Sequence, residues 1–320
     1  MHSSSFTRQA RVPAILFICF AISAGLARAQ EFRSALTGRV SDPSGAVIPG
    51  AKVTAVQNDT SQTYSTKTNS SGDYYIPYML PGVYTVTVGA NGFKTNVQGN
   101  VLLQASASFG LNFTLQVGSI TQSVTVTSAP PLINTASGSS SNVLTGRAIE
   151  NLPLNGRQVY MLIGTTPGSQ FLQTQFGASG YSGTRGWDVS NNYSLGGGIQ
   201  GYNLFTLNGT NITMMGGFGE EGTWMTSPNV DAIQETNIMS NTYDARYGHT
   251  SGGTVNIVTK SGTNLYHGNI YEYLENGALN ANNFENNANG FKRQNTIQHQ
   301  YGGTFGGADQ EGQDLLLWQL

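Results

Sequence analysis

A chain of 320 residues has room for two or three domains, and its composition excludes several classes of protein. Only 10% of the residues are charged and the formal net charge is −2, so the chain lacks the basic surface with which nucleic-acid-binding proteins neutralise phosphates. Gly is frequent, at 41 residues, and Asn, Thr and Ser are abundant, which favours strands and turns over long helices. We therefore expect a mainly β protein with no nucleic-acid partner.

Residues 1–29 are typical of a secretory signal peptide. Two arginines precede an apolar segment at 12–26, and the small residues Ala27 and Ala29 before Gln30 have the spacing of a cleavage site. The apolar segment is shorter than the ~20 residues that a membrane-spanning helix needs, although an anchoring helix is the alternative. Cleavage after Ala29 would remove the only cysteine, so the exported chain could not rely on disulfides.

Residues 30–117 are predicted to form a small antiparallel β-sandwich of roughly seven strands. The runs 51–56 and 83–88 alternate, and Tyr84, Val86 and Val88 should share one buried face. Turn clusters such as Asp42-Pro43-Ser44-Gly45 separate the runs.

Parts of this segment resemble the carboxypeptidase regulatory-like domain; the matching runs are 37–42, 45–53, 72–76, 80–84 and 92–94. The resemblance implies an Ig-like or transthyretin-like sandwich, a group that also includes carbohydrate-binding-like folds, and it does not imply peptidase activity. Two roles stay open for the domain. A rigid spacer is the simpler one, and a docking module for a carbohydrate, a peptide or protein, or a periplasmic energising machinery is the other.

Residues 118–136 are predicted to be a linker strand that ends at Pro130-Pro131, because proline cannot donate to a β-ladder. Residues 143–152 then have helical spacing of their apolar side chains and predict a short helix. The run 203–211 predicts a strand into a tight turn, and 230–238 is either a short helix or a strand.

The motif that follows the predicted helix reads Leu152-Pro153-Leu154-Asn155-Gly156-Arg157. Pro153 should stop the helix, Asn155-Gly156 should turn, and the Arg157 guanidinium can bond carbonyl groups or a carboxylate of a barrel wall. The motif resembles one in the plug domain of Oar-like TonB-dependent outer-membrane receptors. This resemblance implies that residues 137–262 form a mixed α/β plug, which should hold what little helix the exported chain has. Contact of Arg157 with a ligand is the less favoured alternative to a structural bond between plug and wall.

A second match to the same receptors lies at 248–268. A Gly pair, Gly252-Gly253, leads into a β-prone run that includes Asn256 and Thr259, and the turn cluster Lys260-Ser261-Gly262 ends it. The order resembles the junction between the plug and the first barrel strand.

Residues 263–307 should then supply the first strands of an incomplete transmembrane β-barrel, whose outer side would contact outer-membrane lipid. The run 266–274 carries interfacial-type tyrosines, 277–296 is an Asn-rich loop, and 300–307 begins a second strand with Tyr301, Gly303 and Phe305 on one side. Residues 308–320 depart from the Pro, basic patch and Phe run that the resemblance implies after Gly307. The genetic code allows codons for this tail that, when read one base later, encode the expected Pro, basic residues and Phe run. We therefore hypothesise that residues 308–320 are translated out of frame.

No catalytic, cofactor or metal site emerges from the remaining sequence. Gly217 to Gly222 fits G-x-G-x-x-G, but no βαβ unit surrounds it and two carboxylates inside the loop would repel a pyrophosphate. After the signal peptide the histidines are His249, His267 and His299, which are far apart and have no i, i+4 partner. We expect no enzyme activity, no cofactor and no bound metal.

The resemblance implies the N-terminal part of an outer-membrane receptor or transporter for an unidentified ligand, energised by a periplasmic TonB-type protein. No clear TonB-box peptide lies between Gln30 and Arg33, so the site of that contact stays open. As given, the chain is expected to be exported and periplasmic and not to transport, because two strands cannot close a barrel. The alternative is a periplasmic or surface module that binds a carbohydrate or a protein.

Overall fold

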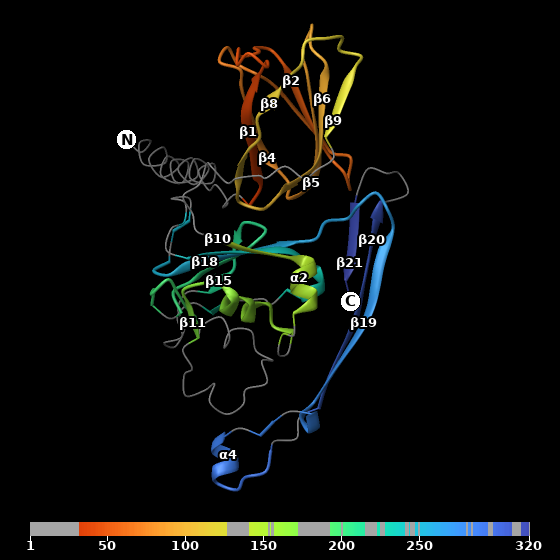
Figure 1. The fold of residues 1–320 in the computed structure, drawn as a ribbon. Helices are drawn as coiled ribbons and strands as arrows, with labels where there is room; N and C mark the ends of the chain where they lie inside the picture. The colour runs from red at the N-terminus through yellow and green to blue at the C-terminus, as the bar shows by residue number, and fades with distance from the viewer. Residues whose placement is uncertain are drawn as a thin grey trace, which may run out of the picture.

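The chain folds into an N-terminal sandwich, a middle domain and a long hairpin, which Figure 1 shows in order from red to blue. The computed structural model describes residues 32–126, 141–152, 154, 157–171, 193–199, 201–214, 223–224, 228–240, 243, 247–248, 250–279, 281–282, 284–293, 297–308 and 315–319. At 214, 223–224 and 315–319 only the backbone is described. The predicted signal peptide, the Pro130-Pro131 pair and the 217–222 glycine run lie outside these residues.

Two sheets form the sandwich. The first joins β4 (Asp73–Met79), β1 (Ser34–Ser41) and β7 (Ser108–Gly110), and β8 (Phe113–Thr114) also pairs with β1. The second has the order β3 (Thr63–Lys67), β2 (Lys52–Gln57), β5 (Gly82–Gly89), β6 (Thr95–Leu103) and β9 (Ser123–Val126). Most neighbours are antiparallel as predicted, but β7 and β8 run parallel to β1, and β9 runs parallel to β6. The predicted linker strand thus adds an edge strand to the second sheet.

The core of the sandwich follows the predicted alternation of β5. Tyr84, Val86 and Val88 are fully buried in one apolar cluster that both sheets supply. The Tyr84 hydroxyl donates to the Leu80 carbonyl at 2.7 Å, so its polar end is satisfied inside the core. Each fully buried large apolar side chain contributes about 1.5–3 kcal/mol, and this cluster stabilises a domain that has no cysteine.

The middle domain is built on a five-stranded sheet with the order β10 (Ser141–Thr145), β17 (Ile233–Ser240), β18 (Gly253–Thr259), β13 (Leu204–Leu207) and β14 (Thr210–Asn211). β13 is parallel to β18 and the other neighbours are antiparallel. Two small ribbons accompany it: β11 (Ser169–Phe171) with β12 (Tyr193–Leu195), and β15 (Thr213–Met214) with β16 (Thr223–Trp224). The helical pieces are α2 (Gly146–Asn151) and the 3-10 helices η2 (Val159–Thr165) and η3 (Val230–Ala232). Apolar residues of α2 and η2 pack on one face of the sheet and form its core.

Local patterns located these elements only in part. The helix predicted at 143–152 begins at Gly146, because 143–145 pair with β17 as part of β10; the predicted start was wrong. The run 230–238 contains both alternatives, a 3-10 turn and then a strand. The tight turn predicted after 204–207 is confirmed, with Asn208 and Gly209 at φ of 48° and 77°.

The C-terminal hairpin pairs β19 (His267–Asn276) with β20 (Ile297–Ala308) along its whole length, and β21 (Leu315–Gln319) pairs with β20. The loop between the long strands holds η4 (Gly277–Leu279) and α4 (Phe284–Ala288), so helix also occurs outside the middle domain. β21 lies in the tail at 308–320 that we hypothesise to be out of frame. Its pairing with β20 does not test this hypothesis, which stays a prediction. None of the described helices is long and apolar enough to cross a bilayer.

Candidate functional site at the contact between the middle domain and the hairpin

The site is centred on Arg157, the last residue of the predicted plug motif. Its Nη2 donates to Oδ2 of Asp231 at 2.7 Å, and the two side chains are only 13% and 3% exposed. η3 positions the carboxylate, because the Asn229 side chain caps this short helix and accepts the Asp231 backbone N–H at 3.1 Å. Two segments that are 74 residues apart are therefore joined by a buried, charge-assisted hydrogen bond.

The hairpin completes the surroundings of Arg157 with two aromatic rings. The guanidinium carbon lies 3.7 Å from the ring centroid of Tyr273 and 5.4 Å from that of Tyr271. The Asn229 amide donates to the Tyr271 hydroxyl, which fixes the second ring. Cation–π contacts of this kind contribute about 0.5–2 kcal/mol. Arg157 thus connects a carboxylate of its own domain to the inner face of β19.

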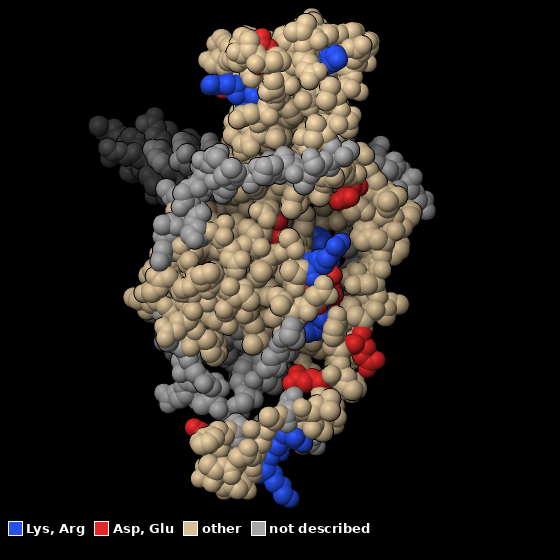
Figure 2. All heavy atoms as spheres, viewed as in Figure 1, with Lys and Arg blue, Asp and Glu red and all other residues tan. Residues whose placement is uncertain are grey.

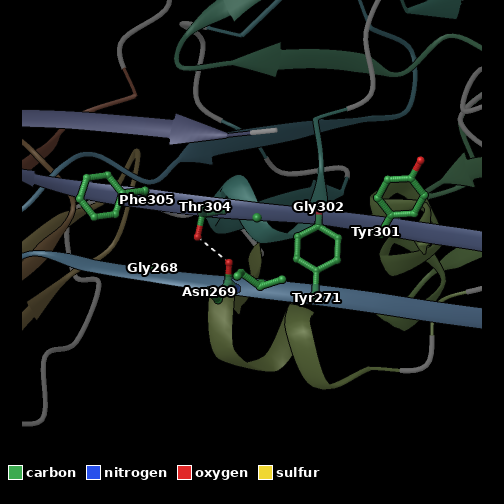
Figure 3. A pocket seen from close by; sticks show the side chains of 9 residues that line it. Gly268, Asn269, Tyr271, Tyr301, Gly302, Thr304 and Phe305 are labelled. Atoms are coloured by element: carbon green, nitrogen blue, oxygen red, sulfur yellow. Dashed lines mark hydrogen bonds between the residues drawn. The ribbon is translucent and has the colours of Figure 1, made fainter.

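The strand register separates the hairpin into an inner and an outer face. Tyr271 and Tyr273 lie opposite Gly302 and Gln300, and on the same inner face the Thr304 hydroxyl donates to the Asn269 side chain (Figure 3). This face is polar and aromatic and is turned toward the middle domain.

The outer face is apolar and uncovered. Its large side chains are Ile270, Leu274, Ile297, Tyr301 and Phe305, which are between 56% and 95% exposed. Glycines on both strands leave a groove of about 820 Å³ beside the aromatic rings of β20 (Figure 3). A hydrogen bond of 3.2 Å between the side chains of Glu272 and His299 interrupts the apolar surface. Apolar-out and polar-in alternation on antiparallel strands of this length is typical of transmembrane β-strands.

The residues predicted at the junction lie along β18, the central strand of the sheet, from the Gly pair at its start to the turn that follows its last residue. A Cβ on Gly253 would lie 2.5 Å from the Met239 carbonyl oxygen, so only glycine fits there. Asn256 accepts the Thr206 hydroxyl at 2.6 Å, and the Asn208 amide donates to the Thr259 hydroxyl at 2.9 Å.

Lys260 ends the strand with two contacts. Its ammonium bonds Glu150 of α2, and its backbone N–H donates to the Ala232 carbonyl at 2.7 Å. Ser261 is exposed and Gly262 is buried. A Cβ on Gly252 would lie 2.6 Å from the Asn203 side-chain oxygen. The junction is thus a packed structural element.

The plug motif is only partly described. Leu152 is 37% exposed and Leu154 packs against the core, while Pro153, Asn155 and Gly156 lie outside the described residues. Sequence reasoning missed Asp231 as the partner of Arg157. Within the described part of the chain, no three His, Cys, Asp or Glu side chains are grouped as a metal site.

Most side chains on the face that Figure 2 shows are uncharged. The charged side chains visible there lie on the sandwich, along the seam between the middle domain and the hairpin, and on the loop at the far end of the hairpin.

Two protein-family models match the chain. The carboxypeptidase regulatory-like domain matches residues 35–116, and the outer membrane beta barrel domain matches residues 258–308. The TonB-dependent transporter Oar of Myxococcus xanthus is 23% identical over 267 residues, which are 80% of this chain and 23% of that protein.

Two solved structures share a weaker similarity with the chain. The ferric enterobactin receptor of Pseudomonas aeruginosa is 18% identical with a TM-score of 0.38, over 54% of this chain and 22% of that one. The outer-membrane transporter YddB of Escherichia coli is 15% identical with a TM-score of 0.38, over 52% of this chain and 24% of that one. The chain spans less than a quarter of each of these three relatives. By the two domain matches and the Oar similarity, the chain is similar to Oar-type TonB-dependent receptors, with a carboxypeptidase regulatory-like domain at 35–116 and a segment of an outer membrane beta barrel domain at 258–308.

Proposed function

We propose that the chain is the N-terminal part of an outer-membrane TonB-dependent receptor that takes up an unidentified ligand. In this proposal the sandwich lies in the periplasm, residues 137–262 form the plug, and residues 263–307 supply the first strands of the barrel wall. The observation that carries the proposal is the two-faced hairpin, which turns an apolar face outward and holds Arg157 of the middle domain on its inner face.

The lengths of the strands agree with this role. β19 has 10 residues and β20 has 12, and a tilted strand needs about 9–11 residues to cross the hydrocarbon core. In a bilayer every backbone group needs a partner, so these strands require further strands that close the barrel. Transport is therefore expected only from a chain in which the barrel is completed. Stable, heat-modifiable insertion of the 320-residue chain into outer-membrane vesicles would contradict this.

The partners follow from the same proposal. The outer face of the hairpin would contact outer-membrane lipid, and a periplasmic TonB-type protein would energise the receptor. The support for both is the similarity to Oar and to the outer membrane beta barrel domain. The ligand would be recognised largely by barrel loops beyond this sequence.

Single-cysteine labelling tests the orientation of the hairpin, because the exported chain contains no cysteine of its own. Ile270→Cys places a fluorophore on the outer face, and Asn269→Cys places it one residue away on the inner face. In detergent micelles, which do not require a closed barrel, detergent with bromine-bearing tails should quench the label at 270 and leave the label at 269 bright. A label at Tyr75→Cys, on the exposed surface of the sandwich, is the control that should stay unquenched. Equal quenching at 269 and 270, or none at either, would overturn the proposed wall.

The alternative role as a carbohydrate- or protein-binding module has one supporting observation. Tyr75 and Tyr78 are 57% and 51% exposed on β4, an edge strand of the sandwich, and the Arg33 guanidinium lies 4.7 Å from the Tyr78 ring centroid. Aromatic faces of this kind can stack on sugar rings. Saturable saccharide binding that a Tyr75→Ala, Tyr78→Ala variant loses would favour this role, and its absence over a broad saccharide panel would count against it.

A further inference from the structure

The sandwich and the middle domain contact each other through residues that are far apart in the sequence. The backbone N–H of Ala105 donates to the carboxylate of Glu235, and the carbonyl of the same residue accepts the Asn237 amide at 3.2 Å. The Pro81 carbonyl accepts the Gln234 amide at 3.1 Å. Two loops at one end of the sandwich are thus bonded to side chains of β17, and Figure 1 shows this end beside the middle domain.

A separate contact lies where the chain leaves the central sheet. The Asn264 backbone N–H donates to the Asp59 carbonyl at 2.9 Å, and its side-chain amide donates to the Ser61 hydroxyl at 3.2 Å. The two domains therefore meet at several points, and the covalent linker is not their only connection.

Glu235 is the charged group at the centre of this contact, and among the described residues no cation pairs with it. The side chain is 5% exposed. The elements packed on it, β10, β18 and the loop 103–107, carry no charged or titratable residue. Burial therefore raises the pKa of Glu235 to about 7, and the Ala105 N–H opposes this only in part.

The charged residues on the flanking elements are exposed or already paired. On α2, Arg147 is exposed and Glu150 pairs with Lys260, while Asp231 on η3 pairs with Arg157. Beside the contact, the Asn237 side-chain oxygen and the Ser106 hydroxyl are buried without a partner among the described residues. The interface is therefore polar and imperfectly satisfied, which is typical of a contact that can separate.

We propose that this contact is a proton-sensitive docking surface, on which the sandwich is held most tightly when Glu235 is protonated and is loosened when its carboxylate ionises. The docked state has the higher affinity for the proton, so docking is strongest below the ordinary pKa of 4.5 and weakens as the pH rises through about 7. The difference between a pKa of 4.5 in the undocked state and about 7 in the docked state makes the docking equilibrium constant roughly 300-fold smaller well above pH 7 than below pH 4.5. The inference does not depend on the proposed function.

Hydrogen–deuterium exchange of the full exported chain between pH 5 and pH 8.5 tests the proposal, with rates corrected for the intrinsic pH dependence of exchange. The Ala105 amide should lose protection as the pH rises. The neighbouring Ser106 amide should keep it, because it donates to the Phe32 carbonyl within the sandwich. Glu235→Gln should make the protection at Ala105 independent of pH. Glu150→Gln makes the same chemical change at the pair with Lys260 and should behave as wild type.

Two results would overturn the proposal. One is protection at Ala105 that does not change with pH in the wild-type chain, a measurement that needs no variant. The other is an unchanged pH dependence in Glu235→Gln when the β5 and β18 amides show that both domains are folded.

Discussion

Replacing Asp231 by Asn tests whether the buried pair with Arg157 holds the middle domain together. Asn keeps the size and one acceptor oxygen but removes the charge, so the guanidinium, 13% exposed, loses its counter-charge. Removing one partner of a buried ion pair costs about 3–5 kcal/mol. The tyrosine faces at 3.7 Å and 5.4 Å remain and offset about 0.5–2 kcal/mol of this. We therefore expect the free energy of unfolding to fall by about 1–4.5 kcal/mol.

A double-mutant cycle with Arg157→Met separates the pair from other effects of each substitution. Urea unfolding of the exported chain, followed by circular dichroism, gives the four free energies, provided that the slopes against urea agree. The double variant should be little worse than Asp231→Asn alone, because it leaves no uncompensated charge. Asp73→Asn, which breaks the exposed pair with Arg39, is the matched control and should change stability little. A coupling energy below about 0.5 kcal/mol between Asp231 and Arg157 would refute this reasoning.

Two further pairs of substitutions test a close backbone contact in the sandwich and the ring contact with Arg157. Gly38→Ala would place a Cβ 1.9 Å from the Leu111 carbonyl oxygen, so it should cost about 3 kcal/mol or more, seen as a lower urea midpoint of the sandwich. Gly99→Ala, whose nearest neighbour would be 3.8 Å away, should hardly change that midpoint, and similar losses for both would contradict the assigned clash. Tyr273→Leu should weaken the contact with Arg157 by about 1 kcal/mol, while Tyr273→Phe keeps the ring face. Faster amide exchange along β19 in the Leu variant alone is the expected result, and equal exchange in both variants would exclude a role for the ring.

The buried faces of the sandwich strands could be predicted from local sequence where apolar and polar residues alternate along the strand. Alternation in β5 identified the buried face correctly, because a strand with one face in a core repeats every two residues. The parallel pairing of β9 with β6 was not predictable. A four-residue strand carries no signal about its partner, and tertiary contacts decide where it pairs.

The candidate site shows the same limit. The motif singled out Arg157, but the sequence left its partner open between carbonyl groups and a carboxylate of a barrel wall. In the structure the carboxylate comes from Asp231 of the middle domain, and β19 of the hairpin supplies the rings of Tyr271 and Tyr273. Their two-residue spacing could have placed both tyrosines on one face of a strand. Nothing local could select Asp231 among 17 acidic residues.

The polar face of β17 explains why that run was ambiguous as helix or strand. Glu235 and Asn237 give the face the pattern of a solvent-exposed surface, yet they are 5% and 3% exposed because the sandwich covers them. An apolar face would bind the sandwich more strongly, but it would expose a hydrophobic patch whenever the two domains separate. Side chains that bond to backbone groups of the sandwich when docked, and to water when undocked, suit both states. The polarity of β17 is therefore what a reversible contact with the sandwich requires, and the ionisation of Glu235 gives that contact its dependence on pH.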